Sequence, residues 1–191
     1  KKVYLNDINN QIIVDTRSQH EFQAGHLENA LNLNFGNLEK YGKTFLTKEQ
    51  PIIFVIEDEE KVQNLTVMVN NLDLKKAEGY ILANDLPIET LVTSETIHVE
   101  DFLKAKEDYI LLDVRTPDEI TRPAPKKNLV NVPLDELFSQ YNQFDENTEI
   151  FTLCGSGNRG TSAASFLNSQ GYKATIITGG MKAMQEFKDS I

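Results

Sequence analysis

The stretch IIVDTRSQHEF, Ile12 to Phe22, returns later in the chain as ILLDVRTPDEI, Ile110 to Ile120. In both stretches an apolar run ends in an aspartate, an arginine stands two positions later, and a glutamate four positions after that. Self-similarity of this kind indicates a tandem repeat. The 191-residue chain is therefore expected to hold two small domains rather than one large one.

The boundary between the copies is expected in the polar segment 86–96, which carries Pro87. We place it after residue 88, so that the domains are 1–88 and 89–191.

When the two copies are aligned with each other, two details lead to further expectations. Gly79 of the first copy matches Gly179 of the second. The first copy shows no counterpart to Glu95–Ile97, which favours a polypeptide that continues upstream of Lys1.

Composition narrows the function classes. Forty per cent hydrophobic and 25% charged residues are ordinary for a globular protein. The net charge of −10 and the lack of a basic stripe argue against a nucleic-acid partner. Apolar runs such as Ile52–Ile56 are far shorter than the ~20 residues that span a bilayer, so no membrane partner is expected. A single cysteine and no signal-like opening segment favour a cytoplasmic setting.

Short apolar runs alternate with segments of helical periodicity, which predicts a mainly parallel α/β sheet with right-handed crossovers. The predicted strands are Ile110–Val114, Glu149–Leu153, Ala174–Thr178 and, in the first copy, Ile52–Ile56, and the predicted helices are Thr161–Gln170 and Lys61–Asn71.

The only cysteine stands in LCGSGNRGTSAA, Leu153 to Ala164. Cys154 falls between a predicted strand and a predicted helix, where open α/β sheets bind their ligands. The small residues would allow a tight turn that points several backbone N–H groups at the sulfur. The amino end of the following helix would add positive potential at the same place. A lone cysteine is more often an inert apolar side chain. The position, the small residues and Arg159 together favour a reactive thiolate instead.

These residues resemble the rhodanese family. The pattern C-x-x-G-x-R from Cys154 to Arg159 follows DVRTPDE (113–119) and precedes TGGMKAM (178–184), and the resemblance covers nearly all of 95–191. It implies an α/β fold of two tandem rhodanese-like domains, each a mainly parallel sheet flanked by helices.

The first copy resembles the same family through DTRSQHEF (15–22) and AGHLENALNL (24–33). Its loop reads IEDEEK (56–61), without cysteine or glycine. The resemblance therefore implies an inactive domain over 1–88 and a catalytic domain over 89–191.

The resemblance implies a sulfurtransferase. Sulfane sulfur would pass from thiosulfate or a low-molecular-weight persulfide, through a persulfide on Cys154, to a thiol, sulfite or cyanide, in persulfide detoxification. No metal or cofactor is expected in this chain. The persulfide-binding loop would consist of Gly155, Ser156, Gly157, Asn158, Arg159 and Gly160.

Asp113, Arg115 and Glu119 are expected to support the loop through buried hydrogen bonds, since the inactive copy keeps all three residue types. For Arg159 two roles stay open: binding an anionic donor, or pairing with one of these carboxylates.

The order of copies also resembles the carboxyl-terminal part of bacterial persulfide dioxygenase–rhodanese fusions, which implies an upstream domain with non-haem iron. The expected partners are small-molecule sulfur donors and acceptors, and the sequence does not specify an oligomeric state.

Two other function classes remain. One is a sulfur-sensing or docking module without turnover. The other is a cysteine phosphatase or arsenate reductase, but those families carry five residues between cysteine and arginine, and four lie between Cys154 and Arg159.

Overall fold

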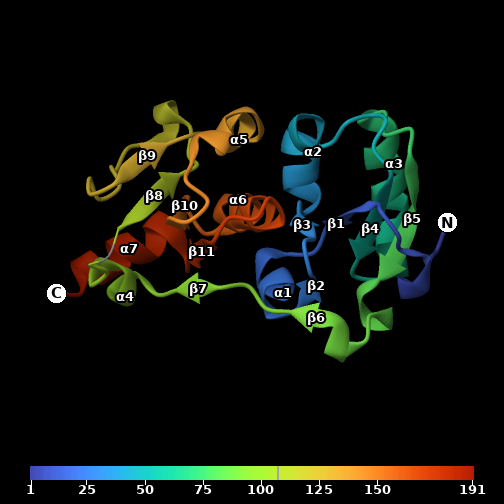
Figure 1. The fold of residues 1–191 in the computed structure, drawn as a ribbon, viewed down its shortest axis with the longest axis horizontal. Coiled ribbons are helices and arrows are strands. Elements are labelled where there is room, and N and C mark those ends of the chain that lie inside the picture. Colours follow the sequence, from blue (N-terminus) through green and yellow to red (C-terminus); the bar gives the residue numbers. More distant parts are fainter. Residues whose placement is uncertain (107) are drawn as a thin grey trace. The chain divides into compact units, whose positions relative to one another are not determined.

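The computed structural model describes residues 1–106 and 108–191, which form two compact units, Lys1–Thr93 and Ser94–Ile191 (Figure 1). Residues 89–93 belong to the first unit, unlike the expected boundary after residue 88. The physical reason is strand pairing, because β6 (Leu91–Val92) pairs antiparallel with β2 (His26–Leu27) of the first unit.

The second unit is built on a parallel sheet in the order β7-β11-β10-β8-β9. Helices α4 and α7 pack together on one face, and α5 and α6 on the other (Figure 1). Both faces are covered, so the central strands are continuous apolar runs. The elements are β7 (Thr96–Ile97), α4 (Val99–Leu103), β8 (Tyr109–Asp113), β9 (Leu129–Asn131), α5 (Leu134–Gln140), β10 (Glu149–Leu153), α6 (Asn158–Ser169), β11 (Ala174–Ile177) and α7 (Gly180–Asp189).

The first unit repeats this plan with a parallel sheet in the order β3-β1-β4-β5. All residues of β4 are buried, which explains its uninterrupted IIFVI sequence. The predicted α/β fold of parallel sheets flanked by helices is confirmed in both units. The remaining elements are β1 (Ile12–Asp15), α1 (Gln19–Ala24), β3 (Leu31–Asn32), α2 (Phe35–Phe45), β4 (Ile52–Ile56), α3 (Val62–Asn71) and β5 (Ala77–Leu82).

The expectation that the first copy lacks a counterpart to Glu95–Ile97 is wrong. Lys2 forms a parallel bridge with Tyr80 on β5, at the place that β7 takes beside β11. The Tyr80 N–H donates to the Lys1 carbonyl at 3.0 Å, just as the Ile176 N–H donates to the Glu95 carbonyl at 2.9 Å. The counterpart is a single β-bridge at Lys2, and its position in the sequence is shifted relative to Glu95–Ile97.

The match of Gly79 with Gly179 is also wrong. Gly79 lies within β5 and pairs with Ile53, whereas Gly179 follows β11 and precedes α7. After β5 the first unit continues in 3₁₀ turns at Ala83–Asp85 and Ile88–Thr90, where the second unit has α7. The two glycines are identical in type, but the strand register shows that they do not occupy equivalent positions.

Among the described residues, no helix is both long enough and apolar enough to cross a membrane.

Candidate functional site

Cys154 lies directly after β10 and before α6, at the carboxyl edge of the sheet. Its side chain is buried, with 1% exposed. Gly157, the residue that precedes α6, has φ of 95°, a left-handed conformation that suits glycine. The chain therefore turns sharply between strand and helix and brings the start of α6 back to the sulfur.

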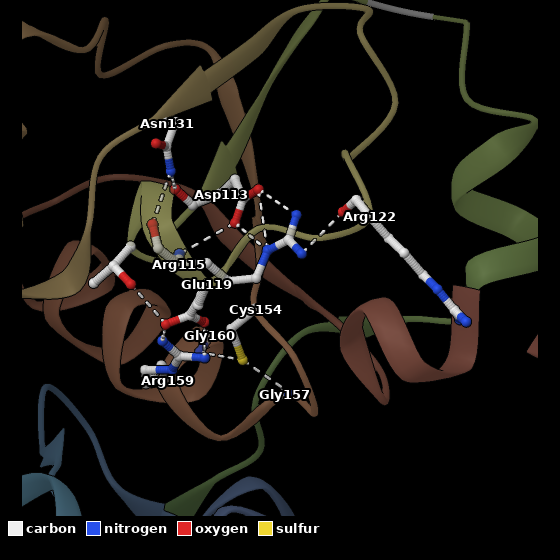
Figure 2. Close-up of polar contacts among 10 residues, drawn as sticks. Asp113, Arg115, Glu119, Arg122, Asn131, Cys154, Gly157, Arg159 and Gly160 are labelled. Carbon is white, nitrogen blue, oxygen red and sulfur yellow. Dashed lines mark hydrogen bonds and ion pairs between the residues drawn. The ribbon is translucent and has the colours of Figure 1, made fainter. Parts of the chain in front are cut away.

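Two backbone N–H groups point at the cysteine sulfur. The N–H groups of Gly157 and Gly160 donate to the Cys154 Sγ at 3.1 Å and 3.3 Å (Figure 2). Both belong to the amino-terminal end of the 12-residue helix α6, where unpaired N–H groups and the helix dipole favour negative charge. The loop therefore has the geometry of a site for a negatively charged group at the sulfur.

A second helix holds the other side of the loop. The N–H groups of Met181 and Lys182, at the start of α7, donate to the carbonyl oxygens of Cys154 and Gly155 at 2.8 Å and 2.9 Å. These two hydrogen bonds hold the first part of the loop against the start of α7.

Gly180 permits this close approach. Its φ is 58°, and a side-chain carbon at this position would collide with the carbonyl oxygen of Cys154. From the sequence, the Gly179-Gly180 pair was interpreted as the end of a strand and as part of the family motif, and its contact with the loop was missed. The available signal was a pair of glycines immediately before a helix.

Arg159 takes one of its two expected roles: it pairs with a carboxylate. Its two terminal nitrogens donate to both oxygens of Glu119 at 2.9 Å and 2.6 Å (Figure 2). The Thr116 hydroxyl donates to the same carboxylate at 2.9 Å. The Arg159 guanidinium, with help from Thr116, lowers the pKa of Glu119 to about 2.

This pair predicts a pH-dependent contribution to stability. The pKa of Glu119 in the folded chain, about 2, lies below its ordinary value of 4.5. The stabilisation is therefore complete above the ordinary value and disappears as the pH falls toward about 2. Because both side chains are partly exposed, we expect about 1 kcal/mol or less. Thermal unfolding of wild type and Glu119→Gln should differ near neutral pH and converge in acid, and a difference that ignores pH would contradict the ion-pair origin.

Asp113 and Arg115 form a second, buried pair. The Arg115 guanidinium donates to both carboxylate oxygens of Asp113 and to the carbonyl of Arg122, the last at 3.0 Å (Figure 2). The Asn131 amide donates to the carbonyls of Asp113 and Arg115, each at 2.9 Å. This network ties the end of β8 to β9 and to the segment after Glu119. Glu119 contacts the cysteine loop through its ion pair with Arg159.

The first unit contains the same network without the cysteine. Arg17 pairs with Asp15 and donates to the Gly25 carbonyl at 2.8 Å, and the Asn32 amide donates to the carbonyls of Asp15 and Arg17. Strand register places the buried Ile56 where the second unit has Cys154. The network therefore supports the fold and is independent of the sulfur.

A family model for the rhodanese-like domain matches residues 2–84 and again residues 98–187. The chain belongs to the rhodanese family. Within this family the loop from Cys154 to Gly160 lies in the second rhodanese-like domain, and the first domain has the acidic loop 56–61 in its place.

Two proteins of Bacillus subtilis are similar in sequence. YrkF, a candidate sulfur carrier protein, is 32% identical over 117 residues, which cover 56% of this chain and 63% of YrkF. YtwF, a candidate sulfurtransferase, is 26% identical over 90 residues, which cover 47% of this chain and 86% of YtwF. The chain thus spans less than two thirds of the length of YrkF.

Among solved structures, a rhodanese-related protein from Thermoplasma volcanium is 27% identical, with a TM-score of 0.46. The match covers 49% of this chain and 92% of that protein.

Proposed function

We propose that the chain is a sulfurtransferase in which Cys154 carries the transferred sulfur. The observation that carries this proposal is the placement of a buried cysteine sulfur against two N–H groups at the start of α6. The rhodanese family and the sulfur-transfer names of YrkF and YtwF support it.

The first step is a displacement at sulfur. The Cys154 thiolate attacks the outer sulfur of thiosulfate or of a low-molecular-weight persulfide. A new S–S bond forms to Cys154, and the S–S bond inside the donor breaks. The bonding electron pair leaves with the donor, as sulfite or as a thiolate, and Cys154 becomes a persulfide.

The second step returns the chain to its starting form. A thiol, sulfite or cyanide attacks the outer sulfur of the persulfide, and the electron pair of the broken S–S bond returns to Cys154 as a thiolate. Between the two steps the negative outer sulfur sits near the N–H groups of the loop, which stabilise it as an oxyanion hole stabilises oxygen. Such a cycle gives ping-pong kinetics and uses only sulfur displacements, without a metal.

The first domain is proposed to be inactive. Ile56 in place of the cysteine offers no nucleophile, and the loop after it is acidic. A role of the chain in persulfide detoxification, and a persulfide dioxygenase domain as its partner, stay predictions from the order of the two copies.

Phosphatase chemistry is disfavoured by the direction of Arg159. A cysteine phosphatase needs its loop arginine for the phosphate oxygens, and here the guanidinium is engaged bidentately by Glu119. A docking module without turnover can be distinguished from a sulfurtransferase. It would accept sulfur on Cys154 but would not release it to a small acceptor.

Intact mass of the full chain tests the proposal. Incubation with thiosulfate or cysteine persulfide is expected to add the mass of one sulfur atom, and subsequent cyanide is expected to remove it as thiocyanate. If neither donor adds sulfur, the sulfurtransferase proposal fails. Sulfur that is added but resists cyanide, sulfite and thiols would identify the docking module.

A further inference from the structure

The cysteine loop contains an arginine, Arg159, whose charge is already neutralised by a carboxylate. Arg159 stands in the first turn of α6, and both of its terminal nitrogens meet the Glu119 carboxylate, at 2.9 Å and 2.6 Å (Figure 2). Thr116 fixes that carboxylate from a further direction, at 2.9 Å. The carboxylate therefore accepts three hydrogen bonds, two of them from Arg159 in matched bidentate geometry.

Arg115, in the neighbouring buried pair, is matched with a carboxylate in the same way. Arg115 is 5% exposed and Asp113 is 1% exposed, and the two are joined by paired hydrogen bonds. The rest of the chain adds a net charge of −10, which repels anions at long range. Both arginines thus contribute little net positive charge to an arriving donor.

The candidate sulfur donors differ in the negative charge that they bring close to Cys154. Thiosulfate carries two negative charges to the Cys154 thiolate and releases sulfite, which carries two again. A low-molecular-weight persulfide brings at most one negative charge at its reacting sulfurs and releases a thiolate. Repulsion between like charges at close range therefore penalises thiosulfate more strongly, unless a free cation compensates.

We infer that Glu119 is a specificity-determining residue: by neutralising Arg159, it makes the site favour low-charge organic persulfides over the thiosulfate dianion as sulfur donors. This inference rests on the proposed sulfur transfer and names its donor class. Glu119 acts through Arg159 and takes no part in the displacement itself.

Donor preference of a Glu119→Gln variant tests the inference. The measured quantity is the ratio of the rate constants for loading Cys154 from thiosulfate and from cysteine persulfide, each followed by intact mass in a single turnover. Glutamine keeps the shape of the side chain and removes its charge, so Arg159 becomes available to an anion. We expect the thiosulfate-to-persulfide ratio to rise about tenfold, as one uncompensated charge near the reacting atoms implies.

A matched control separates this local effect from net charge. Glu149 lies at the amino end of β10, the opposite end of that strand from Cys154, and accepts a hydrogen bond from Thr175. Glu149→Gln removes the same charge and is expected to leave the ratio unchanged. The double variant Glu119→Gln/Arg159→Gln should also return the ratio toward the wild-type value, because no cation is then released.

Three results would overturn the inference: an unchanged ratio in Glu119→Gln, an equal rise in Glu149→Gln, or a rise that survives in the double variant. Should Glu119→Gln fail to fold, Glu119→Ala carries the test. It removes the same carboxylate charge from Arg159, and the ratio must rise in the same direction. Failure of the wild type to load from either donor would instead defeat the proposed function.

Discussion

Cys154→Ser is expected to abolish sulfur loading completely while leaving the fold in place. The serine oxygen occupies nearly the same volume and accepts the same two N–H groups, from Gly157 and Gly160. It cannot form a persulfide, so no sulfur can be held. We expect the free energy of unfolding to change by no more than about 2 kcal/mol, since the hydrogen bonds of the buried donors are kept. Intact mass after incubation with donor, together with urea unfolding, measures both effects.

Cys154→Ala is the matched control for the N–H groups. Alanine also prevents loading, but it removes the acceptor as well. It should therefore be less stable than Cys154→Ser by about 1 kcal/mol or more, because buried N–H groups lose their partner. Sulfur bound stoichiometrically by Cys154→Ser would disprove the role of Cys154. Equal stability of the serine and alanine variants would disprove the N–H contribution.

Gly180→Ala is expected to slow sulfur loading about a hundredfold, because small displacements of reacting groups cost rates of that order. A methyl group at this position collides with the Cys154 carbonyl and comes within 2.9 Å of Gly155. The start of α7 must then move away, and the hydrogen bonds from Met181 and Lys182 to the loop are lost or lengthened. The N–H groups that face the sulfur lose their alignment. Single-turnover loading followed by intact mass measures the effect.

Gly171→Ala is the control for backbone strain alone. Gly171 also has a positive φ, 89°, and an added side-chain carbon there meets nothing within 4 Å. This variant should lose about 1 kcal/mol of stability, like any alanine forced to positive φ, and should keep its loading rate. If Gly180→Ala and Gly171→Ala lose stability and loading alike, the contact between α7 and the loop has no special role in sulfur transfer.

Four buried strands were predictable because burial dictates their sequence, although β8 and β11 end one residue earlier than predicted. β4 and β10 have the bounds that the sequence predicts, since strands covered on both faces are mainly apolar and are ended by turn residues. The start of α6 was predicted at Thr161 and lies at Asn158. Gly160 suggested a loop, but a glycine is tolerated in the first helical turn, where its N–H donates to the sulfur.

Contacts between distant elements were not predictable in the same way. Nothing local to Arg159 shows whether its side chain turns toward a donor or toward Glu119, because the choice depends on where the segment after β8 comes to lie. The contact of α7 with the Cys154 carbonyl likewise requires two segments to meet in three dimensions. The slipped match of Gly79 has the same origin, since register is set by hydrogen bonds between strands.

The network that joins Asp15, Arg17 and Asn32 in one domain, and Asp113, Arg115 and Asn131 in the other, bears on how the two copies diverged. After a duplication, natural selection can act separately on two groups of residues, because the network that holds the strands together does not include the cysteine loop. One copy can then lose its nucleophile by substitution and still be inherited as a folded domain. A copy that loses the network first loses the contacts that hold its strands together, and with them the fold that its chemistry requires.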